Sequence, residues 1–334
     1  MATDLTPILH GGNLDEARRA FPSAPRPWID LSTGINPWPW PVPTLPTEVR
    51  AALPSKSALA ALEAAAALYY GVPDPHLVVA VPGTQAAIQW LPRLISRGAV
   101  AVLGPTYAEH ARGWSLAGHK VVEAASLDAL EGAATAILVN PNNPTGRTVA
   151  PEILLDLAAR KARESLYLVV DEAFADVTPE ISAAGFAGRP GLVILRSFGK
   201  FFGLAGVRLG FVIAPTGLAN ALREAIGPWA VSGEALAIGR AAFEDAEWQA
   251  TMRRRLAEAR ASLDADLDQA GLAIEGGTDL FRLARAAKEP QLFQRLAGAG
   301  LWVRRFEHES AWLRFGLPPD DAARTRLRKA LAEG

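Results

Sequence analysis

A lysine in the middle of the sequence has neighbours that suit covalent chemistry. The segment Ser197-Phe198-Gly199-Lys200 is followed eight positions later by Arg208. A lysine attacks a carbonyl group only as the free amine, so its side chain must be desolvated or must lie beside another cation. Arg208 is a candidate for that cation. A solvated lysine on an exposed turn after a glycine is the alternative.

Apolar runs flank this lysine on both sides. One run ends at Ile194 and Leu195, and the next covers residues 209–214. Such runs are typical of buried strands. We therefore expect Lys200 on a loop at the end of a strand, which favours a functional site over a solvated surface position.

Two upstream segments also place polar residues at strand ends. Residues 166–170 form an apolar run that ends in Asp171 and Glu172, and residues 136–139 form a second run that opens into the turn N-P-N-N-P-T-G of residues 140–146. The first run is typical of a strand buried on both faces, and the second of a strand before a turn. Asp171 could hold a pyridinium nitrogen protonated, or it could simply cap a loop. The order of the three signals favours a site.

This order of motifs resembles the pyridoxal-phosphate enzymes of the aspartate aminotransferase fold, particularly the histidinol-phosphate aminotransferase branch. The resemblance implies that Lys200 forms a Schiff base with pyridoxal 5'-phosphate and that Asp171 pairs with the pyridine nitrogen. Asn143 would donate to the ring 3-oxygen, and Ser197 and Arg208 would bind the phosphate. The chemistry agrees, because the ring withdraws electrons only while its nitrogen is protonated, and a bidentate arginine suits a phosphate.

A turn near residue 84 fits the same site. Gly83, Thr84 and Gln85 lie between an expected strand over residues 77–81 and an expected helix over residues 86–94. Free backbone amides and the positive end of a helix dipole at such a turn attract a phosphate. Alone, the motif is weak.

Two aromatic residues complete the expected cofactor site. Tyr107 matches the position where the family places an aromatic face over the cofactor ring, although an ordinary packed tyrosine is the alternative. The family often has a tyrosine where this chain has Phe174. That departure removes a hydrogen bond to the ring oxygen and leaves Asn143 as its expected donor.

The composition favours one cytosolic enzyme of about two domains. The chain has 334 residues, half of them apolar, with 34 lysines and arginines against 35 acidic residues. This balance predicts small molecules or a second copy of the chain as partners, and neither nucleic acid nor a membrane. There is no cysteine, and the five histidines are scattered, so we expect no metal site. A signal peptide and a membrane-spanning segment are not expected.

The resemblance implies an α/β protein of fold type I, with a parallel-rich sheet in a large domain, a smaller C-terminal α+β domain and an N-terminal arm. Alternating strand and helix patterns from about residue 77 to about residue 225 agree. The expected domains are the arm at 1–54, the cofactor domain at 55–228 and the small domain at 229–334. In the small domain we expect a long helical stretch over 234–269, strands over 280–283 and 301–304, and a last helix from about 320.

The arm also predicts a homodimer. It carries Trp28, Trp38 and Trp40 between prolines. A flat segment with three tryptophans is easier to explain against a second subunit than against water, and the fold has this precedent.

Two arginines near the C-terminus are candidates for substrate binding. The segment L-R-F-G-L-P places Arg314 where the family grips the substrate α-carboxylate, a task that suits a planar guanidinium. A surface salt bridge is the alternative. Arg304 resembles an arginine of the histidinol-phosphate enzymes that contacts a substrate phosphate, with Arg305 as the alternative in register.

Further segments resemble the threonine-phosphate decarboxylases of cobalamin biosynthesis. This likeness implies that His10 and Asn36 line the substrate pocket, with His10 at the phosphate. A neutral histidine satisfied by backbone groups is the alternative for His10. Related phosphate-binding enzymes often have at the position of Leu53 a tyrosine that contacts the site of the second subunit. Leucine has no hydroxyl group and cannot form the hydrogen bond that this tyrosine makes. The segments that carry the likeness are residues 10–13, 28–37, 106–110 and 227–233.

The implied reaction is decarboxylation of L-threonine O-3-phosphate to (R)-1-amino-2-propanol O-2-phosphate and CO2, with Lys200, Asp171 and Tyr107 as catalytic residues. The alternative is an aminotransferase for a phosphorylated substrate such as histidinol phosphate. The two reactions differ in which α-carbon bond stands perpendicular to the cofactor ring, and the sequence does not give that angle. A binding module that has lost catalysis is a third hypothesis, and the complete set of Lys200, Asp171, Asn143 and Arg208 argues against it.

Overall fold

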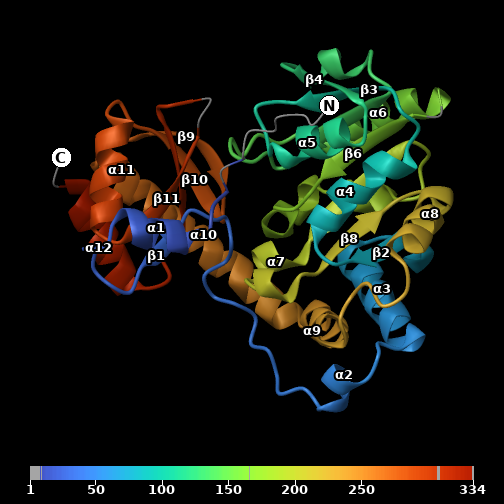
Figure 1. The fold of residues 1–334 in the computed structure, drawn as a ribbon, viewed down its shortest axis with the longest axis horizontal. Coiled ribbons are helices and arrows are strands. Elements are labelled where there is room, and N and C mark those ends of the chain that lie inside the picture. Colours follow the sequence, from blue (N-terminus) through green and yellow to red (C-terminus); the bar gives the residue numbers. More distant parts are fainter. Residues whose placement is uncertain (1–7, 9, 165, 307–308, 333–334) are drawn as a thin grey trace. The chain divides into compact units, whose positions relative to one another are not determined.

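The chain folds into two compact units (Figure 1). The small unit combines Met1–Pro37 with Arg255–Gly334, and the large unit is Trp38–Arg254. This division differs from the expected boundaries at residues 54 and 228, because the first 37 residues belong with the C-terminal part of the chain. The computed structural model describes residues 8, 10–164, 166–306 and 309–332.

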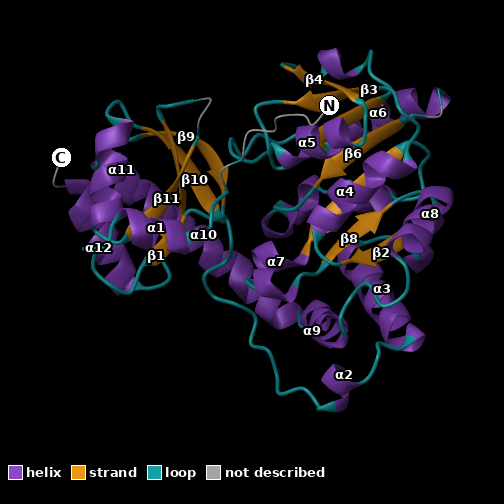
Figure 2. Ribbon diagram, viewed as in Figure 1, coloured by secondary structure: helices purple, strands orange, loops and turns teal. Residues whose placement is uncertain are grey.

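A seven-stranded sheet forms the centre of the large unit, in the order β2-β8-β7-β6-β5-β3-β4 (Figure 2). Neighbouring strands are parallel except at β8, which runs antiparallel to β2 and to β7. Every residue of β5 is buried, as expected for a strand covered on both faces. The expected parallel-rich sheet is therefore present. Its strands are β2 (Val78–Val81), β3 (Ala99–Leu103), β4 (Lys120–Ala124), β5 (Thr135–Val139), β6 (Tyr167–Asp171), β7 (Leu192–Ser197) and β8 (Gly210–Ile213).

Helices cover this sheet. Ile88 of α4, Trp114 of α5 and Leu222 of α8 belong to one core together with strand residues such as Val169. Helix α6 contacts β6 and β7. The helices are α2 (Glu48–Ala51), α3 (Lys56–Tyr70), α4 (Thr84–Leu94), α5 (Glu109–Leu116), α6 (Pro151–Arg163), α7 (Phe198–Phe201), α8 (Thr216–Ile226) and α9 (Gly233–Glu244). Short 3-10 helices are η1 (Pro75–Leu77), η2 (Asp128–Leu130), η3 (Ala175–Val177), η4 (Pro179–Ile181), η5 (Ala184–Phe186) and η6 (Ala205–Val207).

The long helical stretch expected over residues 234–269 consists of two helices. Helix α9 ends at Glu244, and α10 (Ala246–Gln269) begins two residues later. The carboxylate of Asp245, between them, accepts a hydrogen bond from the backbone N–H of Trp248 at 3.0 Å. This side-chain bond to an N–H of the first turn is typical of a residue that starts a new helix. No described helix combines the length and the apolar character needed to cross a membrane.

The one-turn helix α7 follows β7 directly. Lys200 lies in this helix and not on the loop that we expected. Phe198, Phe201 and Phe202 are each at most 1% exposed, and the rings of Phe198 and Phe202 stack with centroids 4.6 Å apart. Their spacing of three and four residues puts the three rings on one side of a helical turn. Aromatic packing in the interior therefore holds the backbone that carries the lysine.

The small unit is built on a five-stranded sheet in the order β1-β11-β12-β10-β9. The strands expected over residues 280–283 and 301–304 are β10 and β11, and the expected last helix is α12. Strand β9 escaped prediction because it contains two glycines and a glutamate. The strands are β1 (Ile29–Leu31), β9 (Ala273–Thr278), β10 (Phe281–Arg285), β11 (Leu301–Arg305) and β12 (Trp312–Gly316). The helices are α1 (Leu14–Ala20), α11 (Glu289–Gly298) and α12 (Asp321–Ala332).

Two of the three tryptophans of the expected arm, Trp28 and Trp40, pack within the chain. Strand β1 pairs in parallel with β11, and the ring of Trp28 meets that of Trp302 edge-on at 6.2 Å. Trp40 belongs to the large unit, is 6% exposed, and donates from Nε1 to the carboxylate of Asp245 at 3.0 Å. These two tryptophans therefore give no reason to invoke a second subunit.

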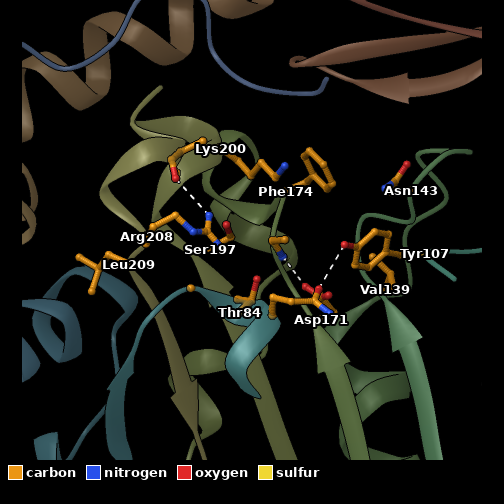
Figure 3. Close-up of a pocket in the computed structure, with 15 residues that line it drawn as sticks. Thr84, Tyr107, Val139, Asn143, Asp171, Phe174, Ser197, Lys200, Arg208 and Leu209 are labelled. Carbon is orange, nitrogen blue, oxygen red and sulfur yellow. Dashed lines mark hydrogen bonds between the residues drawn. The ribbon is translucent and has the colours of Figure 1, made fainter. Parts of the chain in front are cut away.

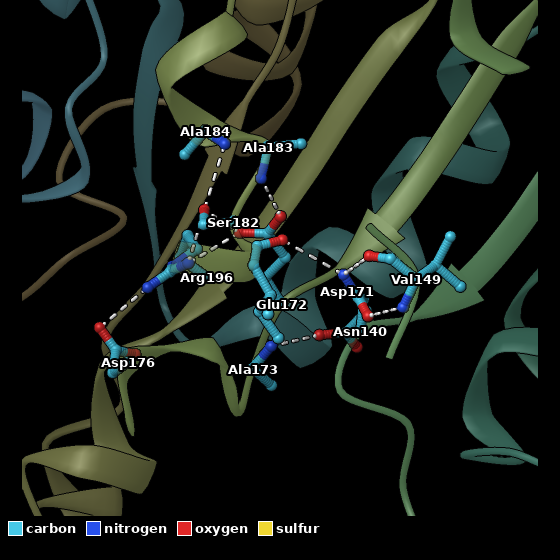
Figure 4. Close-up of polar contacts among 11 residues, drawn as sticks. Asn140, Val149, Asp171, Glu172, Ala173, Asp176, Ser182, Ala183, Ala184 and Arg196 are labelled. Atoms are coloured by element: carbon cyan, nitrogen blue, oxygen red, sulfur yellow. Dashed lines mark hydrogen bonds and ion pairs between the residues drawn. The ribbon is translucent and has the colours of Figure 1, made fainter. Parts of the chain in front are cut away.

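A buried ion network joins the ends of β6 and β7 (Figure 4). The guanidinium of Arg196 donates to Glu172 at 2.7 Å and to Asp176 at 2.9 Å, and its side chain lies over the ring of Tyr70 at 4.3 Å. The three charged side chains are at most 3% exposed. Glu172 also accepts from the backbone N–H of Ala183 at 2.7 Å, so the network also fixes the connection between the two strands. Burial raises the pKa of Glu172, while Arg196 opposes that rise.

We expect Arg196→Met to lower the free energy of unfolding by about 3–5 kcal/mol, because it leaves two carboxylates buried without their cation. Arg160→Met is the matched control. Arg160 makes ion pairs with Glu131 and Asp156, but its side chain is 43% exposed, so its loss should cost less than about 1 kcal/mol. Denaturant unfolding of the cofactor-free proteins measures both values. Equal effects of the two substitutions would contradict this account of the network.

Candidate active site

A cavity of about 180 Å³ opens in the large unit at the carboxyl ends of β5, β6 and β7. Ligands of open α/β sheets bind at this edge. All nine residues expected to contact the cofactor line this one cavity (Figure 3). They are Gly83, Thr84, Gln85, Tyr107, Asn143, Asp171, Ser197, Lys200 and Arg208. The other lining residues are Val139, Ala173, Phe174, Gly199, Ala205 and Leu209.

Lys200 enters the cavity from helix α7. Its Nζ atom lies 5.6 Å from the centroid of the Phe174 ring, and Figure 3 shows the two side chains next to each other. The buried rings of Phe198, Phe201 and Phe202 anchor the helix that carries this lysine. A lysine on a rigid base beside an aromatic ring suits covalent attachment of a carbonyl compound.

Asp171 is held from two sides at the end of β6. Its Oδ2 atom lies 2.8 Å from Nε2 of His110, and its Oδ1 atom accepts from the backbone N–H of Ala173 at 3.0 Å. Asp171 is 3% exposed and His110 is 1% exposed. An ionised carboxylate only accepts hydrogen bonds, so Nε2 of His110 is the donor in that state. The arrangement fixes the carboxylate while it still faces the cavity.

The part of the cavity around Gly83 and Arg208 has the features of a phosphate site. Gly83 precedes helix α4 with φ of 80°, which is a left-handed conformation that favours glycine. A Cβ atom at this position would lie 2.7 Å from Nη2 of Arg208. Thr84 begins the helix, and the N-terminal end of a helix favours an anion. Ser197 and Arg208 line the same cavity. These donors fit a phosphorylated ligand.

The three asparagines in the turn after β5 have different environments. Asn140 exchanges hydrogen bonds with the backbone of Val149 at 2.8 and 3.0 Å. Asn142 accepts from the hydroxyl of Thr106 at 2.6 Å and donates to the carbonyl oxygen of Pro105 at 2.9 Å. Asn143 faces the cavity. The two neighbouring asparagines therefore shape the turn that presents Asn143.

The four expected substrate residues belong to the small unit. Arg304 and Arg314 lie directly opposite each other on the antiparallel strands β11 and β12, so their side chains share one face of the sheet. Arg314 is 6% exposed and donates to the carbonyl oxygen of Ser32 at 2.7 Å. Burial, together with the nearby charge of Arg304, lowers the pKa of Arg314 to about 9. An anion bound by both arginines would offset the burial of the Arg314 charge and its repulsion by Arg304.

Arg305, the alternative in register, has a different environment. It donates to both carboxylate oxygens of Glu289, at 2.7 and 3.1 Å, and lies 4.7 Å from the ring centroid of Phe293. Two atoms of its guanidinium are thus engaged in a bidentate ion pair within the unit. Arg304, and not Arg305, therefore has its side chain on the same face of the sheet as Arg314.

Asn36 and His10 differ in burial. Asn36 is 2% exposed and lines a second cavity, of about 540 Å³, within the small unit. Asp30 and Gly316 line the same cavity. His10 is exposed. Neither residue belongs to the unit that holds the nine cofactor candidates.

Several residues of the site escaped sequence reasoning. His110 and Glu109 stand in the motif T-Y-A-E-H, but nothing in that motif indicates what they contact. His110 meets Asp171 across 61 residues of sequence, and Arg196 meets Glu172 across 24. Among the residues that the structure describes, no group of three or more His, Cys, Asp or Glu side chains is arranged to bind a metal ion.

Comparisons with known proteins identify the family of the chain. A sequence model of the family described as aminotransferase class I and II matches residues 44–331. The threonine-phosphate decarboxylase of a Sinorhizobium species is 46% identical over 330 residues, 98% of each chain. That of Pseudomonas aeruginosa is 45% identical over 325 residues, 96% of each chain.

The fold agrees with that of a solved structure. The histidinol-phosphate aminotransferase of Sinorhizobium meliloti, in complex with pyridoxal-5'-phosphate, has a TM-score of 0.78 to this chain at 20% identity. The match covers 100% of this chain and 98% of that chain. The donors around the cavity suit the same cofactor. The chain therefore belongs to the aminotransferase class I and II family, has the fold type I architecture and uses pyridoxal phosphate as its cofactor.

Proposed function

We propose that the protein decarboxylates L-threonine O-3-phosphate to (R)-1-amino-2-propanol O-2-phosphate and CO2 in the biosynthesis of cobalamin. The observation that carries this proposal is the near-full-length likeness to two proteins named threonine-phosphate decarboxylase. The pair of arginines on one face of the small sheet supports it, because the substrate carries a carboxylate and a phosphate. A cytoplasmic location remains a prediction from composition.

The residues of the cavity divide the chemistry among them. Bound pyridoxal phosphate supplies a protonated ring that accepts the electron pair left on the α-carbon when CO2 departs. In our proposal Lys200 holds the cofactor covalently until the substrate amine takes its place, and its freed Nζ, or a water molecule, then returns a proton to the α-carbon. Asp171, oriented by His110 at 2.8 Å, keeps the pyridine nitrogen protonated. Asn143 donates to the ring 3-oxygen, a role that gains weight because Phe174 has no hydroxyl group.

The two ends of the substrate require different cations. We assign the α-carboxylate to Arg314, whose buried guanidinium gains most from an anionic partner, and the phosphate to Arg304 on the opposite strand. His10 and Asn36 are further candidates for substrate contacts. With both anionic ends held, the bond to the carboxylate can be kept perpendicular to the ring, which is the orientation that decarboxylation requires.

An aminotransferase for a phosphorylated substrate such as histidinol phosphate is the second candidate, because a fold neighbour carries that name. Incubation with L-threonine O-3-phosphate distinguishes the two. A decarboxylase releases one CO2 for each amine that it forms. It forms no keto acid from threonine phosphate, even when another keto acid is added as an amino-group acceptor. Formation of a keto acid without CO2 would replace the first proposal by the second.

We expect Lys200→Ala to abolish covalent attachment of the cofactor and to reduce turnover below detection, while the fold is kept. The side chain contributes a covalent bond and a proton, whereas the phenylalanines beside it supply the packing. Borohydride reduction followed by peptide mass spectrometry measures the attachment. Lys56→Ala, an exposed lysine of the same unit, is the control and should keep both properties. A reduced cofactor bound to another lysine of the parent protein would refute the assignment.

Substitution of the two arginines should separate their roles. A charge-assisted hydrogen bond contributes about 1.5–3 kcal/mol, so Arg304→Ala should lower kcat/KM for threonine phosphate on the order of tenfold to 150-fold. It should leave the weak turnover of free threonine nearly unchanged, whereas Arg314→Ala should lower both rates.

Arg285→Ala is the matched control, since Arg285 is a half-exposed cation of the same sheet that pairs with Glu275. It should change neither rate. If Arg304→Ala slows both substrates equally, Arg304 has a structural role and another group binds the phosphate.

We also propose a homodimer, on the precedent of the fold and on exposed apolar side chains of the large unit. Leu53 is 68% exposed and Trp229 is 58% exposed, and they adjoin helices α2 and α9, which contact each other. Sedimentation at micromolar concentration should give twice the chain mass of 35.5 kDa. The substitution Trp229→Gln should weaken the dimer, whereas Ile153→Gln, on helix α6 and 48% exposed, should not. A monomer in the parent protein would contradict the proposal.

A further inference from the structure

A short chain of hydrogen bonds leads away from the wall of the cofactor cavity. The hydroxyl of Tyr107 donates to Oε1 of Gln85 at 3.3 Å, and Nε2 of Gln85 donates to Oε2 of Glu109 at 3.0 Å. Tyr107 and Gln85 line the cavity, whereas Glu109 does not. Glu109 is 9% exposed, so its carboxylate acts in a largely dry environment. Such surroundings strengthen hydrogen bonds and make an unsatisfied group costly.

The chemistry of this chain fixes its direction. A side-chain amide has an oxygen and an NH2 group of nearly equal size, so a half-turn of Gln85 would exchange acceptor and donor with little steric change. The carboxylate of Glu109 accepts and cannot donate. It therefore selects the orientation in which the amide nitrogen faces Glu109. The amide oxygen then faces the tyrosine, and the hydroxyl of Tyr107 must donate.

The same segment of chain supports other parts of the site. Thr106 donates to Asn142, whose turn presents Asn143 to the cavity. The ring of His110, which bonds to Asp171, meets the ring of Tyr107 edge-on at 6.0 Å and 84°. A rotation of Tyr107 would therefore disturb the imidazole ring that orients Asp171, the carboxylate that would hold the pyridine nitrogen protonated. The position of Tyr107 matters for more than its own contact with the cofactor.

We propose that Glu109 is a positioning residue: through the amide of Gln85 it holds the ring of Tyr107 in the orientation that packs on the cofactor ring. This inference rests on the proposed roles of Tyr107 and the other cavity residues, and it assigns a role to a residue outside the cavity. Glu109 does not touch the reacting atoms. Its effect should appear in how tightly the cofactor is held, before any substrate is added.

The first test compares single variants by titration of the cofactor-free protein with pyridoxal phosphate. Glu109→Gln removes the group that selects the amide orientation, and we expect it to raise the dissociation constant of the cofactor about tenfold. Gln85→Glu places two carboxylates against each other and should raise it by at least as much. Glu152→Gln, an exposed first-turn glutamate of helix α6, is the control and should leave the constant within twofold of the parent value. A change of less than twofold for Glu109→Gln would overturn the proposal.

The second test exchanges the two side chains. In the double variant Gln85→Glu and Glu109→Gln, the amide at 109 can donate to the carboxylate at 85, which can still accept from the Tyr107 hydroxyl. The formal charge is unchanged and the Tyr107 hydroxyl still donates to position 85, while the hydrogen bond between positions 85 and 109 reverses its direction. We therefore expect the double variant to recover cofactor affinity to within about threefold of the parent. Affinity no better than that of the single variants would count against the proposal.

The third test asks whether Glu109 acts through Tyr107. In a Tyr107→Phe background the amide has no hydroxyl to orient, so adding Glu109→Gln should raise the dissociation constant less than twofold further. An undiminished tenfold effect in that background would show a general structural role and would refute the inference. Because every measurement uses cofactor without substrate, failure of the threonine-phosphate assignment would leave these results unchanged.

Discussion

The cofactor site depends on one buried cation. Side chains alternate in direction along a strand, so the residues adjacent to Asp171 and Ser197 point away from the cavity that these two line. Those neighbours are Glu172 and Arg196, which pair at 2.7 Å. The same ends of β6 and β7 therefore carry the site on one face and its ionic clamp on the other. Asp176 and Ser182, further along the connection, bond to the same guanidinium, and the connection begins with the lining residues Ala173 and Phe174.

Two buried arginines of this chain, Arg196 and Arg314, differ in the charged groups around them and therefore in the direction of their pKa shifts. Arg196 faces two carboxylates, and these outweigh burial and raise its pKa above its ordinary value. Arg314 is buried to a similar extent, and burial together with the charge of Arg304 outweighs the charge of Asp30 and lowers the pKa of Arg314 to about 9. A charge that is compensated within the protein has no need of a ligand, whereas one that is destabilised gains from an anion. This difference supports the proposed roles, a structural one for Arg196 and a substrate-binding one for Arg314.

The sequence predicted the parts of the site that depend on local order. Asp171, Ser197 and Lys200 each follow an apolar run, and a parallel sheet brings such strand ends to one edge. Contacts set by tertiary packing could not be predicted, because the pattern around Glu109 or His110 is that of any polar helix start. The contacts of two tryptophans could not be predicted for the same reason. Trp28 and Trp40 are amphipathic side chains in a proline-rich segment, and only the fold shows that Trp302 and Asp245 satisfy them.

Because Phe174 has no hydroxyl group, the turn after β5 would have to supply the hydrogen-bond donor to the ring 3-oxygen. If Asn143 is the donor to the ring 3-oxygen, as we propose, its position must be defined by the backbone, because a short amide side chain cannot compensate for a misplaced turn. The structure fixes that backbone at both neighbouring asparagines: Asn140 bonds to Val149 in both directions, and Asn142 bonds to Pro105 and Thr106. The Asn142 contacts reach the segment that also carries Tyr107 and Glu109. In our proposal, the donor to the ring oxygen and the aromatic wall of the cavity therefore depend on two adjacent residues, because Thr106 bonds to the turn that presents Asn143 and Tyr107 lines the cavity.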